Sequence, residues 1–170
     1  MEHDACGVGL VASTEGLKSR KVVEYGIEAL KAVWHRGAID ADGKTGDGAG
    51  IHIEIPNDFF AEKIEITGHE HDNSDLCVGM IFLPRNDFGG QEQCRSIVES
   101  ELTKKNFNIY GWRQVPVDPS VLGEKAEQTR PEITQVLFTH NDKSIHGKDL
   151  ERALYETRRK IEKEALRNQL

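Results

Sequence analysis

The sequence contains few of the residues on which several large classes of protein depend. Its 170 residues include only two tryptophans, three tyrosines and three cysteines, and the net charge is −7. An acidic chain with so few aromatic rings disfavours nucleic acid or an anionic membrane as partner, because both call for a basic face. No stretch approaches the ~20 apolar residues of a membrane span, and residues 1–5 lack the basic and apolar parts of a secretory signal. We therefore expect a cytosolic protein.

The cysteines give no sign of a disulfide framework. Cys6, Cys77 and Cys94 are odd in number and widely spaced, and no CxxC metal signature occurs. Cys77 and Cys94 lie on apolar faces of predicted elements, which is typical of core positions. A length of 170 residues with 37% hydrophobic residues suits one domain with a real core.

Apolar periodicity predicts alternating groups of strands and helices. Helices are expected at residues 21–34, 57–63, 91–104 and 148–168, and strands at 6–12, 51–55, 76–83, 107–117 and 132–139. Gly111 is expected to form a bulge or bend within its strand. The strands come in adjacent pairs with helices between the pairs. This order favours hairpins and mainly antiparallel sheets, so the predicted fold class is α+β.

The stretch from Arg36 to Gly50 contains five glycines and must be a loop. Its GDGAG segment lacks the dinucleotide-binding spacing, because the third glycine falls one residue early, and it precedes a strand. Three aspartates suggest calcium, but Lys44 occupies a position where an EF-hand needs an oxygen ligand. Two interpretations stay open: a purely structural turn, or a rigid loop whose backbone approaches a ligand closely.

No metal site is predicted elsewhere. His69 and His71 lie two residues apart in a polar loop, and no cysteine or third histidine stands at a ligand spacing from them. We expect solvated loop histidines. A metal-binding module at this loop is the third functional alternative, which metal analysis would test, and we expect no metal there.

Cys6 has two possible roles. Free cysteine is among the most buried residue types, so a core position on a strand is one possibility. The other depends on removal of the five residues before it. The thiol, with a reference pKa of about 8.5, would then share one residue with an amine of pKa roughly 7.7–8.0. Such a residue carries nucleophile and base together.

Four stretches together resemble a known family. They are CGVGLVA from Cys6, IEALKAVWHRGAIDADGKTGDGAGIHIEIP at 27–56, IYGWRQVPVD at 109–118, and GEKAEQTRPEI. They look like the N-terminal region of the glutamate synthase large subunit. The HRG-x-D-x-DG portion with an early Cys-Gly also resembles class II glutamine amidotransferases in general, which belong to the N-terminal-nucleophile family. The similarity covers nearly the whole chain.

The resemblance implies an αββα sandwich of antiparallel sheets, incomplete in this chain. Residues 1–5 would be a propeptide-like leader, and residues 6–170 the first part of a type 2 glutamine amidotransferase domain. Cys6 would attack the side-chain amide of glutamine, form a thioester and release ammonia for transfer to 2-oxoglutarate. Arg36, Gly37, Asp47 and Gly48 would support that site without taking part in the chemistry.

The same resemblance implies what lies outside this chain. No cofactor is expected here, whereas FMN and an iron–sulfur cluster are expected elsewhere in the full-length protein. The expected partners are glutamine, the remainder of the large subunit, and further copies of the chain through self-association. The location would be the cytoplasm, or a plastid or organellar stroma in a eukaryote.

The chain departs from the family in one important respect. The resemblance implies that the family's oxyanion donors, an Asn-Gly pair, lie downstream of these residues, and none of the seven asparagines here is followed by glycine. It implies the same for the arginine and aspartate that grip the α-carboxylate and α-amine of glutamine. Because loss of one oxyanion donor costs about 10²–10³ in turnover, we expect this chain to be inactive alone, with residues 1–5 still attached. The alternative is a non-catalytic binding or assembly module that retains the fold.

Overall fold

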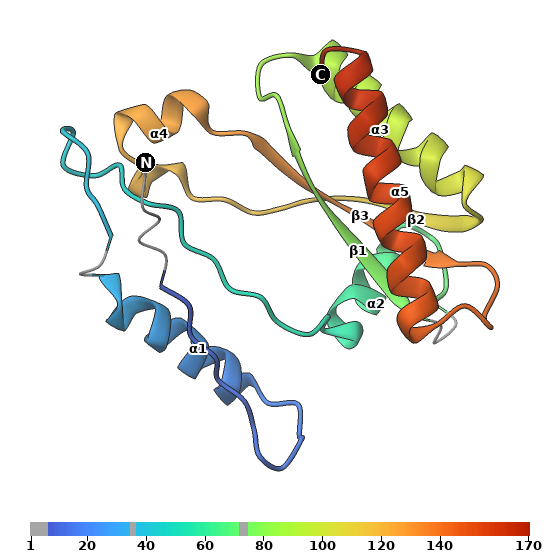
Figure 1. Ribbon diagram of the computed structural model, residues 1–170, viewed down its shortest axis with the longest axis horizontal. Helices are drawn as coiled ribbons and strands as arrows, with labels where there is room; N and C mark the ends of the chain where they lie inside the picture. The colour runs from blue at the N-terminus through green and yellow to red at the C-terminus, as the bar shows by residue number, and fades with distance from the viewer. Residues whose placement is uncertain (1–6, 35–36, 72–74) are drawn as a thin grey trace. The chain divides into compact units, whose positions relative to one another are not determined.

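The computed structural model describes residues 7–34, 37–71 and 75–170 (Figure 1). The chain divides into two compact units. One consists of Met1–Glu54 and Asp118–Thr129, and the other of Ile55–Val117 and Arg130–Leu170. Cys6 and Arg36 lie outside the described residues.

The second unit is built on a three-stranded antiparallel sheet. Its strands are β1 (Leu76–Leu83), β2 (Phe107–Gln114) and β3 (Glu132–His140), in the order β1-β3-β2. β1 pairs with β3 along the whole length of β1, from Leu76 opposite Thr139 to Leu83 opposite Glu132. The central strand is thus the last of the three in the sequence, and β1 and β2 form the edges.

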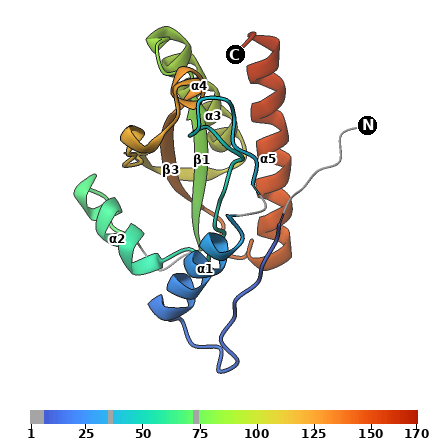
Figure 2. The same ribbon diagram turned by 90° about the vertical axis from the view of Figure 1, so that its left-hand side faces the viewer.

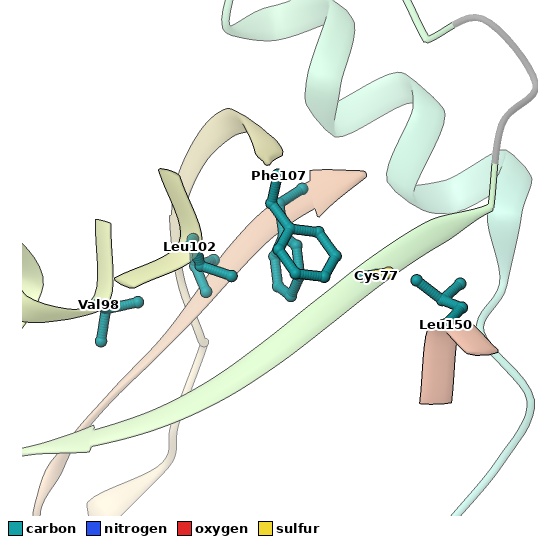
Figure 3. Close-up of a cluster of buried hydrophobic side chains, with 7 residues drawn as sticks. Cys77, Val98, Leu102, Phe107 and Leu150 are labelled. Carbon is teal, nitrogen blue, oxygen red and sulfur yellow. The ribbon is translucent and has the colours of Figure 1, made fainter. Parts of the chain in front are cut away.

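Helices cover both faces of this sheet (Figure 2). Helices α3 (Phe88–Lys104) and α5 (Gly147–Arg167) pack on one face. The buried side chains between these helices and the strands form one cluster (Figure 3). Its members are Cys77, Val98, Leu102, Phe107, Val136, Phe138 and Leu150. Helix α2 (Asn57–Ile66) lies on the opposite face, where Phe60 and Ile64 pack against Leu137. Alternate residues of β3 therefore face opposite helical layers.

Local sequence signals account for α3 and α5. Asp87 precedes α3, and its carboxylate accepts a hydrogen bond of 2.9 Å from the Gly90 amide, which satisfies one unpaired donor at the helix start. In α5 the inward stripe includes Leu150 and Thr157, both buried. The Thr157 hydroxyl donates to the Ala153 carbonyl at 2.7 Å, so this buried polar group is paired within its own helix.

The predicted bulge in β2 is confirmed. The pairing register with β3 shifts between Ile109 and Gly111, and Gly111 has a φ of +149°. A side chain at this φ would be strained, so the bend requires glycine. The extra residue is Tyr110, whose ring is buried against α2. The bulge thus turns an aromatic side chain toward the second helical layer.

The first unit contains helices and loops. Helix α1 (Arg20–Ala32) begins at Ser19, whose hydroxyl accepts a hydrogen bond from the Lys21 amide at 3.2 Å. A 3-10 turn, η2 (Pro119–Val121), and the short helix α4 (Glu124–Thr129) complete the unit. Among its described residues no strand forms, apart from one isolated bridge between Ile39 and Gly46.

Two strand predictions are wrong for this reason. The described part of 6–12 is irregular, with Val8 97% and Leu10 92% exposed, and 51–55 is irregular as well. Strict alternation in a sequence defines two faces, but a strand forms only where a second strand completes its hydrogen bonds. Neither segment has such a neighbour among the described residues.

The α+β class and the antiparallel pairing are confirmed. The described residues form one sheet with helices on either side, and a second sheet is not among them. No helix in these ranges is both long and apolar enough to cross a bilayer.

We expect Leu102→Ala to destabilise the chain by about 2–5 kcal/mol, because Leu102 is 2% exposed in the α3–sheet core. The matched control is Leu166→Ala, since Leu166 lies in α5 but is 77% exposed, and its cost should stay within about 0.5 kcal/mol. Urea unfolding followed by circular dichroism measures both. Equal shifts of the midpoint would contradict the packing described for α3.

Candidate functional site

Residues 37–48, here called the glycine loop, follow helix α1 in the first unit and close on themselves at their base. The Ala38 amide donates to the Asp47 carboxylate at 2.9 Å, and the Asp47 amide donates to the Ala38 carbonyl at 3.3 Å. The isolated bridge between Ile39 and Gly46 continues this pairing. Asp47 therefore joins the two limbs of the loop through both its backbone and its side chain.

Glycine permits this close approach at two positions. A Cβ on Gly46 would lie 2.8 Å from the Ala38 carbonyl oxygen, and one on Gly37 would lie 3.3 Å from the Trp34 carbonyl oxygen. The Gly37 amide donates to that same Trp34 oxygen at 3.0 Å. Gly48 differs, because a Cβ there would meet nothing within 4 Å. The space around Gly48 therefore does not itself require glycine.

Asp42 organises the tip of the loop. Its carboxylate accepts hydrogen bonds from the Lys44 amide at 3.0 Å, from the Thr45 amide at 2.7 Å and from the Thr45 hydroxyl. The Thr45 hydroxyl first, and then these amides, hold the pKa of Asp42 well below its usual range. The Asp42 carboxylate is therefore ionised at neutral pH, and in this form it accepts all three hydrogen bonds.

The segment 118–129, here called the connector because it joins β2 to β3 in the sequence, contacts this tip. The Lys125 ammonium lies 2.8 Å from each carboxylate oxygen of Asp40. The Ala126 amide donates to the Thr45 hydroxyl oxygen at 3.4 Å. Two pieces of chain that are distant in sequence thus meet within the first unit.

The structure places the predicted support residues in different surroundings. Gly37 and Asp47 come together at the base of the loop, where a Cβ on Gly37 would lie 4.0 Å from the Asp47 carboxylate. Gly48 follows Asp47 in open space. Cys6 and Arg36 lie outside the described residues, so their roles stay predictions.

The acidic residues of the loop do not assemble a metal site. Across residues 7–34, 37–71 and 75–170 no group of three or more histidine, cysteine or acidic side chains could hold a metal ion. Asp40 instead pairs with Lys125, and Asp42 with amides and a hydroxyl. His69 and His71 flank the Tyr110 ring, with ring centroids 6.1 and 5.8 Å from it.

Neither described cysteine is activated. Burial raises the pKa of the Cys77 thiol to about 12, with the nearby charges of Asp75 and Glu151 adding to the effect. Burial also raises the pKa of Cys94, and Asp87 contributes. Since the thiolate is the reactive form, neither thiol is reactive at neutral pH. Cys77 lies in the core, as the sequence predicted, whereas Cys94 is only partly buried and belongs to neither core cluster.

Sequence reasoning did not find the contact between loop and connector. Asp42, Gly43 and Thr45 carry a turn signal, because aspartate bonds amides two or three residues ahead. Gly123 marks a possible break before α4. No local pattern, however, pairs residues such as Asp40 and Lys125, which are 85 positions apart.

Comparison with known families identifies the family of the chain. The model of the class II glutamine amidotransferases matches residues 6–170, so the chain belongs to this family.

Similar proteins include large chains of glutamate synthases. The chain is 54% identical over 162 residues to the glutamate synthase (NADPH) large chain of Azospirillum brasilense, which covers 95% of this chain and 11% of that protein. It is 38% identical over 163 residues to the chloroplastic ferredoxin-dependent glutamate synthase 2 of Arabidopsis thaliana, covering 95% of this chain and 10% of that protein. The chain thus spans about a tenth of the length of these relatives.

We expect Asp47→Ala to open the base of the glycine loop. A hydrogen bond contributes about 0.5–1.5 kcal/mol net, so exchange of the Ala38 amide hydrogen should become roughly threefold to tenfold faster. Gly48→Ala is the control, because its added methyl group meets no neighbour and should leave that exchange rate unchanged. Amide exchange followed by NMR measures both. An unchanged rate in Asp47→Ala would show that the carboxylate does not hold the loop.

Proposed function

We propose that this chain is the first part of the glutamine-hydrolysing domain of a glutamate synthase, with Cys6 as the nucleophile. The observation that carries the proposal is the family match, which starts at Cys6 and runs through residue 170. The 54% identity to a glutamate synthase large chain supports the assignment within the family. Residues 1–5 are then a leader, and residues 6–170 begin a type 2 amidotransferase domain within an αββα sandwich.

The chemistry requires the leader to be removed. The freed α-amine of Cys6 takes the thiol proton, and the thiolate sulfur forms a bond to the side-chain amide carbon of glutamine. The C–N bond breaks, the nitrogen leaves as ammonia with the proton that the amine returns, and a thioester remains. Water then attacks the thioester, which releases glutamate and restores the thiol.

The proposed role of the support residues is to hold the Cys6 thiol in position. Arg36 directly precedes the glycine loop, and we assign to it the charge-assisted hydrogen bonds that hold the loop beside Cys6. Asp47 keeps the base of the loop closed through the Ala38 contact, and the Gly37 amide bonds the Trp34 carbonyl at the start of the loop. Gly48 completes the assigned set as a support residue next to Asp47.

The remaining steps belong to the longer protein. There the ammonia would reach 2-oxoglutarate at a flavin site, with FMN and an iron–sulfur cluster as cofactors. The two cysteines described here do not suit a cluster, which needs several thiolates close together, because the described residues bring together no group of three or more potential metal ligands. We place the enzyme in the cytoplasm, or in a plastid or organellar stroma for a eukaryotic source. Without the family's Asn-Gly oxyanion pair, this chain alone would release almost no glutamate.

Labelling with a glutamine-mimicking electrophile tests the proposal. In a complete glutamate synthase that carries the residues of this chain at the matching positions, we expect saturable labelling of Cys6 that glutamine prevents. The chain alone, prepared to begin at Cys6, should release glutamate at least roughly a hundredfold more slowly than that enzyme. Mass analysis of the labelled peptides identifies the site. Cys77 and Cys94 serve as internal controls, because their raised pKa values keep them as thiols.

The outcomes separate the two candidate functions. Labelling that glutamine prevents supports Cys6 as the nucleophile of a glutamine-hydrolysing domain. Thiol reactivity that glutamine does not affect would favour the alternative, a binding or assembly module without chemistry.

We also propose that the chain associates with itself or with the remainder of the large subunit. Leu76, Met80 and Phe82 share one face of β1, but α2 covers only the Leu76 end. Leu76 is 7% exposed, Met80 47% and Phe82 64%. β1 is in addition an edge strand of eight residues without a charged side chain. Uncovered edges with apolar faces of this kind favour association.

Phe82→Lys should therefore weaken self-association, because natural proteins block exposed edges with lysine. Leu166→Lys is the control, since Leu166 is 77% exposed in the last turn of α5, away from β1 in sequence. Sedimentation velocity at several concentrations, together with binding of an apolar dye, provides the measurement. A monomer without dye binding before any substitution would refute association through β1.

A further inference from the structure

The connector meets the glycine loop at a position where only glycine fits. A Cβ added to Gly123 would overlap the Thr45 amide nitrogen and hydroxyl oxygen and the Asp42 carboxylate. The hydroxyl can rotate away, but the amide nitrogen belongs to the backbone and moves only if the loop moves. Gly123 is also buried. The connector and the tip of the loop are therefore in direct backbone contact.

Hydrogen bonds make the two segments depend on each other. Helix α4 has six residues, and its first amides have no partner within the helix. The Lys125 amide donates to the Asp42 carboxylate at 3.5 Å, and the Ala126 amide donates to the Thr45 hydroxyl oxygen at 3.4 Å. So short a helix is marginal by itself. The loop thus caps α4, while α4 fixes the side chains that shape the tip of the loop.

The ion pair between Lys125 and Asp40 is a smaller contribution. Its side chains are 59% and 38% exposed, and exposed ion pairs contribute little because water screens them. The backbone contact at Gly123 and the Thr45 hydroxyl therefore carry most of the coupling between loop and connector.

We propose that Gly123 and Thr45 are positioning residues for the glutaminase site, an inference that rests on the function proposed above. By seating the connector against Asp42 and Thr45, Gly123 fixes the tip of the glycine loop. The Ile39–Gly46 bridge and the Ala38–Asp47 contacts extend that order to the residue next to Arg36. Displacement of a catalytic group by about 1 Å can cost 10²-fold in rate.

The test uses a complete enzyme. In the large chain of the Azospirillum brasilense glutamate synthase, the 162 matching residues are replaced by those of this chain. Gly123→Ala in this hybrid should lower kcat for glutamine hydrolysis roughly tenfold to hundredfold. The KM for glutamine should change less than about twofold, because the groups that grip the substrate are expected outside this chain. A general loss of folding would instead reduce the amount of active enzyme and of every activity equally.

Matched variants separate positioning from folding. Val121→Ala introduces the same residue in the same connector, but Val121 is 69% exposed, so kcat should stay unchanged. Thr45→Val removes the hydroxyl that holds Asp42 and Ala126, and it should lower kcat in the same way as Gly123→Ala. Thr45→Ser keeps the hydroxyl, so its kcat should stay near that of the unsubstituted hybrid. This pair decides the question if Gly123→Ala does not fold.

Each outcome bears on one proposal. Unchanged kcat in both Gly123→Ala and Thr45→Val overturns the positioning role and leaves the proposed function intact. Absence of glutamine hydrolysis in the unsubstituted hybrid overturns the proposed function. In that case amide exchange in the 170-residue chain tests whether the connector and the glycine loop are coupled. Faster exchange of the Ala38 and Thr45 amides in Gly123→Ala supports this coupling, and equal exchange overturns it.

Discussion

Pairing along β3 is the constraint on which the larger unit depends. β3 completes the hydrogen bonds of both β1 and β2, which have no other strand beside them among the described residues. Its Val136 is 1% exposed and lies opposite Gly79, where a Cβ would come within 2.7 Å of the Val136 side chain. The absence of a side chain at Gly79 thus gives Val136 its place in the core. The packing of α3 and α5 follows, since both helices rest on the cluster that contains Val136.

The smaller unit satisfies its backbone by other means. Its described residues form no sheet, and the amides of its loop pair with carboxylates: Ala38 with Asp47, and Lys44 and Thr45 with Asp42. Short acidic side chains next to glycines suit this purpose, because they reach nearby amides and glycine allows the limbs to approach. The richness in aspartate and glycine, which suggested calcium or nucleotide sites, has this structural explanation for Asp42 and Asp47.

The sequence correctly predicted those helices and strands that have a clear apolar pattern and also find a packing or pairing partner in the fold. The uncharged run 76–83 and the periodic stripe of α5 are long, and tertiary packing is present to match them. Residues 51–55 show equally clear alternation but lack a partner strand, which no local pattern reveals. Helix α4 was missed because it has six residues and takes its cap from Asp42 and Thr45, far away in sequence. Of the site, the loop was predictable from its glycines, whereas its contact with the connector is a property of the fold.

The family's chemistry places a particular demand on the thiol. A nucleophilic cysteine must reach the thiolate near neutral pH, and burial prevents this at Cys77, where it raises the pKa to about 12. Burial acts in the same direction at Cys94. Cys6 differs from both, because the α-amine that it would gain as the first residue is itself a base of suitable pKa. This difference supports the proposal that the nucleophile is Cys6, the residue at which the family match begins.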